Sequence, residues 1–200
     1  MITLLAAAIA YLLGAIPFGY LLVNWTTGRD VRTGGSGNIG ATNVLRTTGR
    51  AAGIGTLLLD IGKGYLAVWI AGRLSDHGVT AMGVAALAVM AGHAYPVFLH
   101  FKGGKAVASF VGAFLCLTPL ALAAVLVVFV VVVAWTRYIS MGSIVGAATF
   151  PLGVWLLHKD LTMLAVAAIA GAFIIYKHSS NLRRLHAGTE HAFTFGAGKS

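Results

Sequence analysis

Glycines and short hydrogen-bond donors alternate between residues 33 and 49, in the stretch TGGSGNIGATNVLRTTG. The glycines are Gly34, Gly35, Gly37 and Gly40, and the polar side chains between them include Ser36, Asn38, Thr42 and Asn43. Glycines let the backbone approach a ligand closely and direct its N–H groups at an anion. Arg46 adds a planar cation suited to two phosphate oxygens. The stretch therefore predicts a phosphate-binding loop, because a flexible connector would explain the glycines but not the donors.

Two familiar nucleotide motifs almost fit this loop, and both fail. Gly35, Gly37 and Gly40 have the spacing of a dinucleotide fingerprint, but no predicted strand precedes them. Ala41 stands where a nucleotide-triphosphate loop needs its lysine. The loop is thus predicted to bind phosphate without binding a nucleotide.

A second candidate lies at 92–108, GHAYPVFLHFKGGKAVA. Lys102, Gly103, Gly104 and Lys105 come just before an apolar run, where the N-terminus of a helix also favours anions. A second phosphate site fits this pattern, and so do lysines that merely anchor membrane helices. His93 fits a general base and a hydrogen-bonded structural histidine equally well.

The third candidate is YKHSSNLRRLHAGTE, residues 176–190. If the preceding helix continues, Lys177, Asn181 and Arg184 share one face, as do His178 and Asn181. Anchoring at the membrane surface would account for the basic residues without a function. This segment supports a functional site only in combination with the other two segments.

Asp60 and Lys63 lie three residues apart in the apolar run LLLDIGKGYLAV. Charges within a membrane span are costly unless they are paired or face a polar cavity. We expect a mutual ion pair that supports the site, rather than direct catalysis.

The elements that carry these loops are predicted to be membrane-spanning helices. The chain has 200 residues, of which 58% are hydrophobic and 10% charged, and its mean hydropathy is +0.89. A soluble domain of this size cannot bury so much apolar surface. Seven spans are predicted, near 2–24, 51–73, 79–99, 106–118, 120–136, 142–157 and 161–177. Pro119 either separates two spans or kinks one long helix, and we expect two.

The positive charges indicate how the chain crosses the membrane. Most fall on one side of the predicted spans: Arg29, Arg32, Arg46, Arg50, Lys102, Lys105, Arg137, Lys177, Arg183, Arg184 and Lys199. Arg73 and Lys159 fall on the other side. The rich side is expected to be cytoplasmic, which places the N-terminus outside and the C-terminus inside. The first helix is expected to be retained, and residues 1–200 to form a single membrane domain.

The net charge of +9 does not indicate nucleic-acid binding, because the cations lie in short loops between apolar runs. Cys116 lies in an apolar run and is expected to be a packing residue. The histidines are scattered without carboxylate or cysteine partners, so no metal site is expected.

Taken together, SGNIGATN (36–43), GHAYPVFLHFKGGKAVA (92–108) and HSSNLRRLHAGTE (178–190) resemble the three motifs of the bacterial acyl-phosphate:glycerol-3-phosphate acyltransferases, the PlsY family. The resemblance implies a seven-span all-α enzyme of the bacterial cell (inner) membrane. It would transfer an acyl group from acyl phosphate to the 1-hydroxyl of glycerol 3-phosphate, releasing inorganic phosphate. It implies no cofactor and no covalent enzyme intermediate, and allows a transient contact with the soluble enzyme that makes acyl phosphate.

By motif, the resemblance implies these catalytic residues: Ser36, Asn38, Arg46, His93, Lys105, His178 and Asn181. It implies these phosphate-binding residues: Gly37, Gly40, Thr42, Asn43, Lys102, Gly103, Gly104, Ser143 and Arg184. The doubled Arg183-Arg184 leaves open which arginine meets the substrate. His178, His93 or a substrate phosphate oxygen could accept the proton, and the resemblance favours the phosphate.

Two other classes are compatible with basic polar loops. A transporter of phosphorylated anions usually has broken helices at the membrane midplane and paired repeats, and we find neither pattern. A non-catalytic lipid-binding anchor would not need so many glycines among its donors.

Overall fold

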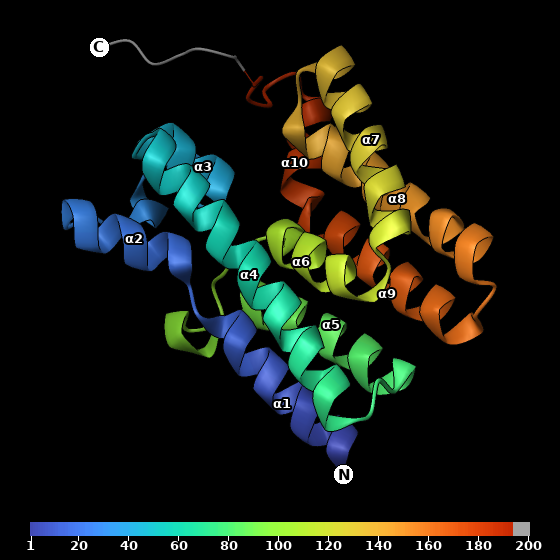
Figure 1. The fold of residues 1–200 in the computed structure, drawn as a ribbon. Coiled ribbons are helices and arrows are strands. Elements are labelled where there is room, and N and C mark those ends of the chain that lie inside the picture. Colours follow the sequence, from blue (N-terminus) through green and yellow to red (C-terminus); the bar gives the residue numbers. More distant parts are fainter. Residues whose placement is uncertain (194–200) are drawn as a thin grey trace. The chain divides into compact units, whose positions relative to one another are not determined.

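The computed structural model describes residues 1–193, and within them the chain is all helical, as predicted (Figure 1). The helices are α1 (Ile2–Ala15), α2 (Phe18–Thr27), the 3₁₀ helix η1 (Val31–Thr33), α3 (Ala41–Thr47), α4 (Arg50–Leu74), α5 (Val79–Ala94), the 3₁₀ helix η2 (Val97–Leu99), α6 (Val107–Leu117), α7 (Pro119–Thr136), α8 (Ile139–His158), α9 (Leu161–Lys177) and α10 (Ser179–His186). Lys199, expected on the basic side, lies outside the described residues.

Prolines end two helices earlier than the sequence predicts. The expected single helix near 2–24 is interrupted, because Ile16 is extended and Pro17 separates α1 from α2. The expected helix near 79–99 stops at Ala94, before Pro96, and a turn of 3₁₀ helix follows. Proline lacks an N–H donor and disfavours helical geometry in the residue before it. Both breaks release backbone for loops at the ends of helices.

The chain divides into two compact units, a first unit from Met1 to Leu117 and a second unit from Thr118 onward. The division falls where Pro119 begins α7, so the apolar run 106–136 forms two helices, as predicted. The single domain over 1–200 stays a prediction.

In the first unit, α1 packs against α5 and α4 packs against α6. Small residues allow the backbones to come close, as is common between membrane helices. A Cβ added at Gly14 of α1 would strike the Val89 carbonyl of α5, and one at Gly92 of α5 would strike the Tyr11 carbonyl of α1. Gly64 of α4 and Gly112 of α6 are placed in the same reciprocal way. These contacts hold α4 and α5 as a rigid support for the loops.

In the second unit, α8 packs against α7 and α9. Thr118 and His158 share a hydrogen bond of 2.6 Å, which joins the start of α7 to the end of α8. The Asp160 carboxylate accepts from the Met163 N–H at 2.7 Å and caps the start of α9. The third polar segment, residues 176–190, begins at the C-terminal end of α9.

Five helical segments within residues 1–193 are long and apolar enough to span a membrane: Ile2–Thr27, Arg50–Leu74, Val79–Leu99, Pro119–Thr136 and Ile139–His158. α9 reaches that length only together with α10, and the two are bent by 54°. α6 has 11 residues, fewer than a perpendicular span requires. The chain is therefore a multi-spanning helical protein, while the count of seven and the orientation of the termini stay predictions.

Candidate functional site

The first loop, residues 28–40, is organised around the side chain of Asn43 on α3. Asn43 is 2% exposed. Its Nδ2 donates to the carbonyls of Val31 and Gly34, each at 3.2 Å, and of Asn38 at 2.8 Å. Its Oδ1 accepts from the Ser36 N–H at 2.8 Å. Asn43 thus uses its amide to hold the loop, and direct phosphate binding by it stays a prediction.

Arg32 makes an ion pair within the start of this loop and a ring contact with α2. Arg32 donates through Nε and a terminal nitrogen to the Asp30 carboxylate, at 3.0 and 2.6 Å. The Arg32 guanidinium also lies 5.3 Å from the centre of the Tyr20 ring. The hydrogen bond from Arg32 holds the pKa of Asp30 below its ordinary value, against the opposing effect of partial burial. Arg32 is therefore a structural cation of the loop.

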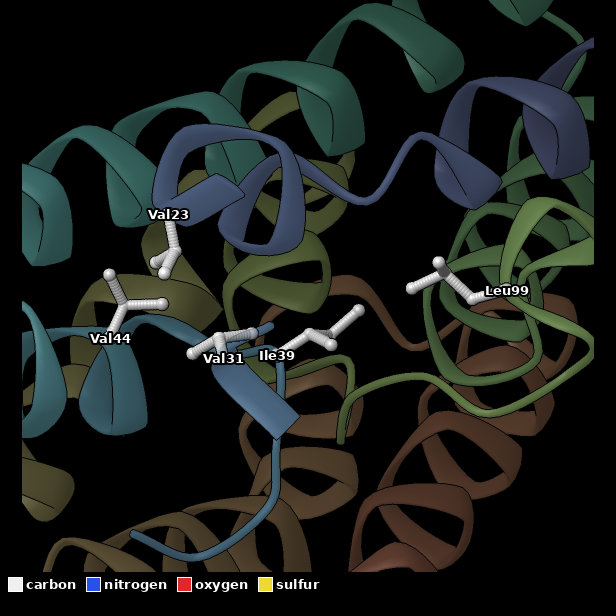
Figure 2. Close-up of a cluster of buried hydrophobic side chains, with 5 residues drawn as sticks. All are labelled: Val23, Val31, Ile39, Val44 and Leu99. Carbon is white, nitrogen blue, oxygen red and sulfur yellow. The ribbon is translucent and has the colours of Figure 1, made fainter. Parts of the chain in front are cut away.

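A hydrophobic cluster lies beneath the first loop. Figure 2 shows its five buried members, which are Val23, Val31, Ile39, Val44 and Leu99. They come from α2, η1, the first loop, α3 and η2. Leu99 belongs to the second loop, residues 95–106. The shared cluster thus brings the first loop and the second loop together, as a common phosphate-binding region would require.

Several predicted binding groups are exposed on the first loop and on α3, which follows it. Ser36, Gly37, Thr42 and Arg46 are exposed. Thr42 and Arg46 are one helical turn apart on α3. The Asn38 Oδ1 accepts from the Gly40 N–H at 2.8 Å, and Gly37 has a φ of +70°, which a residue with a side chain rarely adopts. The exposed hydroxyls and Arg46, next to a loop that Asn43 holds in place, can receive an anion.

The second loop is built on His93, which is buried at the end of α5. The Gly104 N–H donates to the His93 carbonyl at 3.0 Å. A Cβ at Gly103 would strike that carbonyl, and a Cβ at Gly104 would strike the His93 Nε2. The two glycines are therefore needed for packing on His93, whatever they bind. Lys102 is exposed and Lys105 half-buried on either side of them.

Three buried ionisable side chains lie behind the second loop. Lys63 Nζ is 2.7 Å from Asp60 Oδ1, so the predicted ion pair is confirmed. The same Nζ donates to the Ile16 carbonyl at 2.8 Å, in the break between α1 and α2. His93 Nδ1 lies 3.6 Å from Asp60 Oδ1. The participation of His93 was not predicted, because His93 and Asp60 are 33 positions apart in the sequence and lie on different helices.

The third polar segment, in the second unit, is held by Glu190. Its carboxylate accepts from Ser140 Oγ at 2.8 Å, Asn181 Nδ2 at 2.6 Å and Arg184 Nε at 2.7 Å. Burial alone would raise the pKa of Glu190, but the hydrogen bonds from Asn181, Ser140 and Arg184 hold it below its ordinary value. Sequence reasoning missed this role of Glu190. The sign of this role in the sequence was a single acidic residue, Glu190, that follows several basic residues.

The shared face expected for Lys177, Asn181 and Arg184 is wrong in one respect. Lys177 ends α9, whereas Asn181 and Arg184 lie on α10 beyond the 54° bend. Of the doubled arginines, Arg184 bonds Glu190 and Arg183 is exposed. The ion pair with Glu190 makes Arg184 part of the polar cluster of the second unit.

His178 lies at the bend and is buried. Its Nδ1 is 2.8 Å from the Ile174 carbonyl, so this nitrogen donates and the neutral ring has its acceptor at Nε2. Ser143 Oγ donates to the Ile139 carbonyl at 3.0 Å within α8. The histidine tautomer suits a proton acceptor, while the serine is turned to its own helix.

Known proteins resemble this chain along nearly its whole length. The family model described as glycerol-3-phosphate acyltransferase matches residues 4–188. A glycerol-3-phosphate acyltransferase from Desulforamulus reducens is 47% identical, over 90% of each chain. One from Geobacter sulfurreducens is 46% identical, over 95% of this chain and 97% of that protein. A solved structure of PlsY (YgiH), an integral membrane glycerol 3-phosphate acyltransferase in its glycerol 3-phosphate form, is 36% identical, with a TM-score of 0.91 and 96% of each chain covered. A second, in its lysophosphatidic acid form, has a TM-score of 0.87.

Proposed function

The chain belongs to the glycerol-3-phosphate acyltransferase family, and we propose that it transfers an acyl group from acyl phosphate to the 1-hydroxyl of sn-glycerol 3-phosphate. The products are 1-acyl-glycerol 3-phosphate (lysophosphatidic acid) and inorganic phosphate. The observation that carries this proposal is the cluster shared by the first and second loops. It supports two glycine-rich, cationic loops acting together on phosphorylated substrates.

Both proposed substrates carry a phosphate, so the protein must neutralise two anionic groups. Arg46, Lys102 and Lys105 are the proposed cations of the first unit, and the exposed hydroxyls of Ser36 and Thr42 add donors. Gly37, Gly40 and Asn43 shape the first loop, and Gly103 and Gly104 the second. A guanidinium and ammonium groups in fixed loops suit this task, since no reorganisation is needed when charge moves.

The reaction proposed here needs no covalent enzyme intermediate. The substrate hydroxyl oxygen attacks the acyl carbon, the bond from that carbon to the phosphate oxygen breaks, and phosphate leaves with the electron pair. One proton passes from the hydroxyl to an acceptor. Acyl phosphate is already activated, so positioning the reactants and stabilising the oxyanion account for catalysis.

The proposed catalytic side chains are Ser36, Asn38, Arg46, His93, Lys105, His178 and Asn181, with Ser143 and Arg184 as further phosphate-binding groups. A substrate phosphate oxygen is the proposed proton acceptor, and His178 is the alternative supported by its tautomer. We place the enzyme in the bacterial inner membrane with its N-terminus outside and its C-terminus and active site on the cytoplasmic side. No cofactor takes part in the proposed reaction.

Phosphate release tests the donor. Detergent-purified protein is given palmitoyl phosphate or palmitoyl-CoA, each with and without glycerol 3-phosphate. We expect release from palmitoyl phosphate only in the presence of glycerol 3-phosphate, and a fall of about a hundredfold or more in Lys105→Ala. Arg50→Ala removes an exposed cation beside the first loop and serves as the control.

Two outcomes would count against the proposal. Folded protein that acylates glycerol 3-phosphate from palmitoyl-CoA and leaves palmitoyl phosphate intact refutes the acyl-phosphate donor. Protein that moves labelled glycerol 3-phosphate into liposomes without altering it is a transporter.

A further inference from the structure

The charged side chains buried in the first unit are not explained by substrate binding alone. Asp60 and Lys63 are 2% and 4% exposed on a helix that is long and apolar enough to span the membrane, and His93 is 3% exposed beside them. We call these three residues the buried network. Placing charges inside a membrane helix costs free energy. An ion pair whose attraction only offsets the loss of hydration would not stabilise the fold, so its presence needs another explanation.

The buried network is connected at both ends to the backbone that leads into the two loops. At one end, the Lys63 ammonium donates to the carbonyl of Ile16. Pro17 follows Ile16 and precedes α2, the helix that leads into the first loop. At the other end, the His93 carbonyl accepts from the Gly104 N–H, and a Cβ added at Gly104 would strike the His93 ring. The Asp60 carboxylate lies close to both the Lys63 ammonium and the His93 ring.

We infer that the buried network is a positioning device that sets the second loop relative to the first loop, and so determines the affinity for glycerol 3-phosphate. Asp60 and Lys63 are positioning residues in this account, since they act through Ile16 and His93. The inference rests on the proposed function only in naming glycerol 3-phosphate as the ligand.

The physical argument follows the position of Asp60. Asp60→Asn keeps the size of the side chain but removes the charge that faces both Lys63 and His93. The His93 ring then no longer faces the carboxylate that lies 3.6 Å from its Nδ1, and this ring occupies the space that a Cβ at Gly104 would need. Displacing a binding loop by about an ångström is enough to change a rate or an affinity by about a hundredfold.

A structural ion pair and a positioning device predict different results for the double variant Asp60→Asn/Lys63→Met. Removing both charges relieves the cost of burying an unpaired one, so either account expects the fold to recover its stability. Only the positioning device expects weak glycerol 3-phosphate binding to persist, because the Ile16 carbonyl no longer receives the Lys63 ammonium and the His93 ring no longer faces a carboxylate. Stability and affinity therefore separate in this variant.

The experiment measures glycerol 3-phosphate binding by calorimetry without any acyl donor, together with thermal unfolding of the same samples in detergent. Thr56→Val is the matched control, since Thr56 is a fully buried polar residue of the same helix that donates to the Ala52 carbonyl of that helix. We expect Kd to rise about tenfold or more in Asp60→Asn and in the double variant. Thr56→Val should bind like wild type.

Steady-state kinetics with palmitoyl phosphate supply the second readout. The buried network predicts a raised KM for glycerol 3-phosphate in Asp60→Asn and in the double variant. A double variant that unfolds like wild type and binds glycerol 3-phosphate like wild type overturns the inference. Wild-type protein that binds glycerol 3-phosphate but releases no phosphate from acyl phosphate refutes the proposed donor, and the calorimetry still decides the role of the network.

Discussion

Glu190 is the side chain on which the polar residues of the second unit converge. Ser140, Asn181 and Arg184 come from two helices and all donate to its carboxylate. A carboxylate that accepts from one hydroxyl, one amide and one guanidinium keeps all three donors in fixed positions. The position of Asn181, a proposed catalytic residue, therefore depends on a group outside the proposed site.

Glu190→Gln should destabilise the protein, because Arg184 loses its ion pair and one donor loses its acceptor. Hydrogen bonds to charged groups contribute about 1.5–3 kcal/mol each, and we expect a loss near the lower end because Arg184 is partly exposed. At this chain length that corresponds to a fall of about 3–6 °C in the unfolding temperature at pH 7. Thermal unfolding in detergent measures it, with the exposed Asp76→Asn as control.

The same variant should also change the response to acid. The folded-state pKa of Glu190 is lowered, so its contribution to stability is complete above the ordinary carboxyl pKa and is lost as pH falls through the lower folded value. We therefore expect wild type to lose stability below about pH 4, and Glu190→Gln to lose less over that interval. Identical acid profiles for the two proteins would contradict the bonding seen here.

Asn43→Ala should loosen the first loop without disrupting the helices. The substitution removes three donated hydrogen bonds and one accepted bond that together close the loop. Limited trypsin digestion reports the change, since Arg32 and Arg46 flank the bonded region. We expect cleavage there to accelerate severalfold, with Thr42→Ala, an exposed neighbour on α3, cleaved at the wild-type rate.

At the scale of the helices, close glycine contacts determine which faces pack. α4 offers a matched pair on one helix. A Cβ at Gly64 would strike the Ser109 carbonyl of α6, whereas a Cβ at Gly62 would meet nothing within 4 Å. α6 begins directly after the second loop, so this interface also fixes the end of that loop.

Gly64→Ala should therefore lower the unfolding temperature, because α4 and α6 must separate to admit one methyl group. Overpacking of this kind typically costs about 1–3 kcal/mol. Gly62→Ala should be neutral or slightly stabilising, since alanine is the better helix former. Thermal unfolding of the two variants side by side gives the comparison, and equal stability would mean that the helices pack less closely than described.

At the scale of the whole molecule, the proposed direction in which the helices cross the membrane makes a testable prediction. The two basic residues predicted to lie outside each follow a tryptophan by four positions, and each has its charge over that ring: Arg73 at 5.2 Å from Trp69, and Lys159 at 5.6 Å from Trp155. Tryptophan and basic side chains are enriched at membrane interfaces. Each pair therefore fits the end of a helix at a membrane surface.

Single-cysteine labelling tests this orientation. In a Cys116→Ser background, a membrane-impermeant maleimide applied to spheroplasts should label Asp76→Cys and Asp160→Cys. Arg29→Cys and Arg183→Cys should react only after the membrane is permeabilised. Labelling of Arg183→Cys in intact spheroplasts would place the C-terminus outside and reverse the proposed topology.

Much of the structure can be predicted from residues that are close together in the sequence. Apolar runs of span length require helices in lipid, so most helix boundaries were predicted within a few residues. The Asp60–Lys63 pair was predictable because helical positions three apart are neighbours. The loops containing Ser36, Arg46 and Lys105 were recognisable because glycines, short donors and cations alternate there without an apolar period.

Packing between distant segments decided the rest. His93 joins Asp60 and Gly104 only because α4 and α5 come together and the second loop turns back on α5. Asn43 proved to be the frame of its loop, and Glu190 the acceptor for Asn181 and Arg184, through bonds that no helical period encodes. Side chains of the same type bind a ligand or hold a loop according to which backbone groups surround them. Those surroundings exist only once the chain has folded.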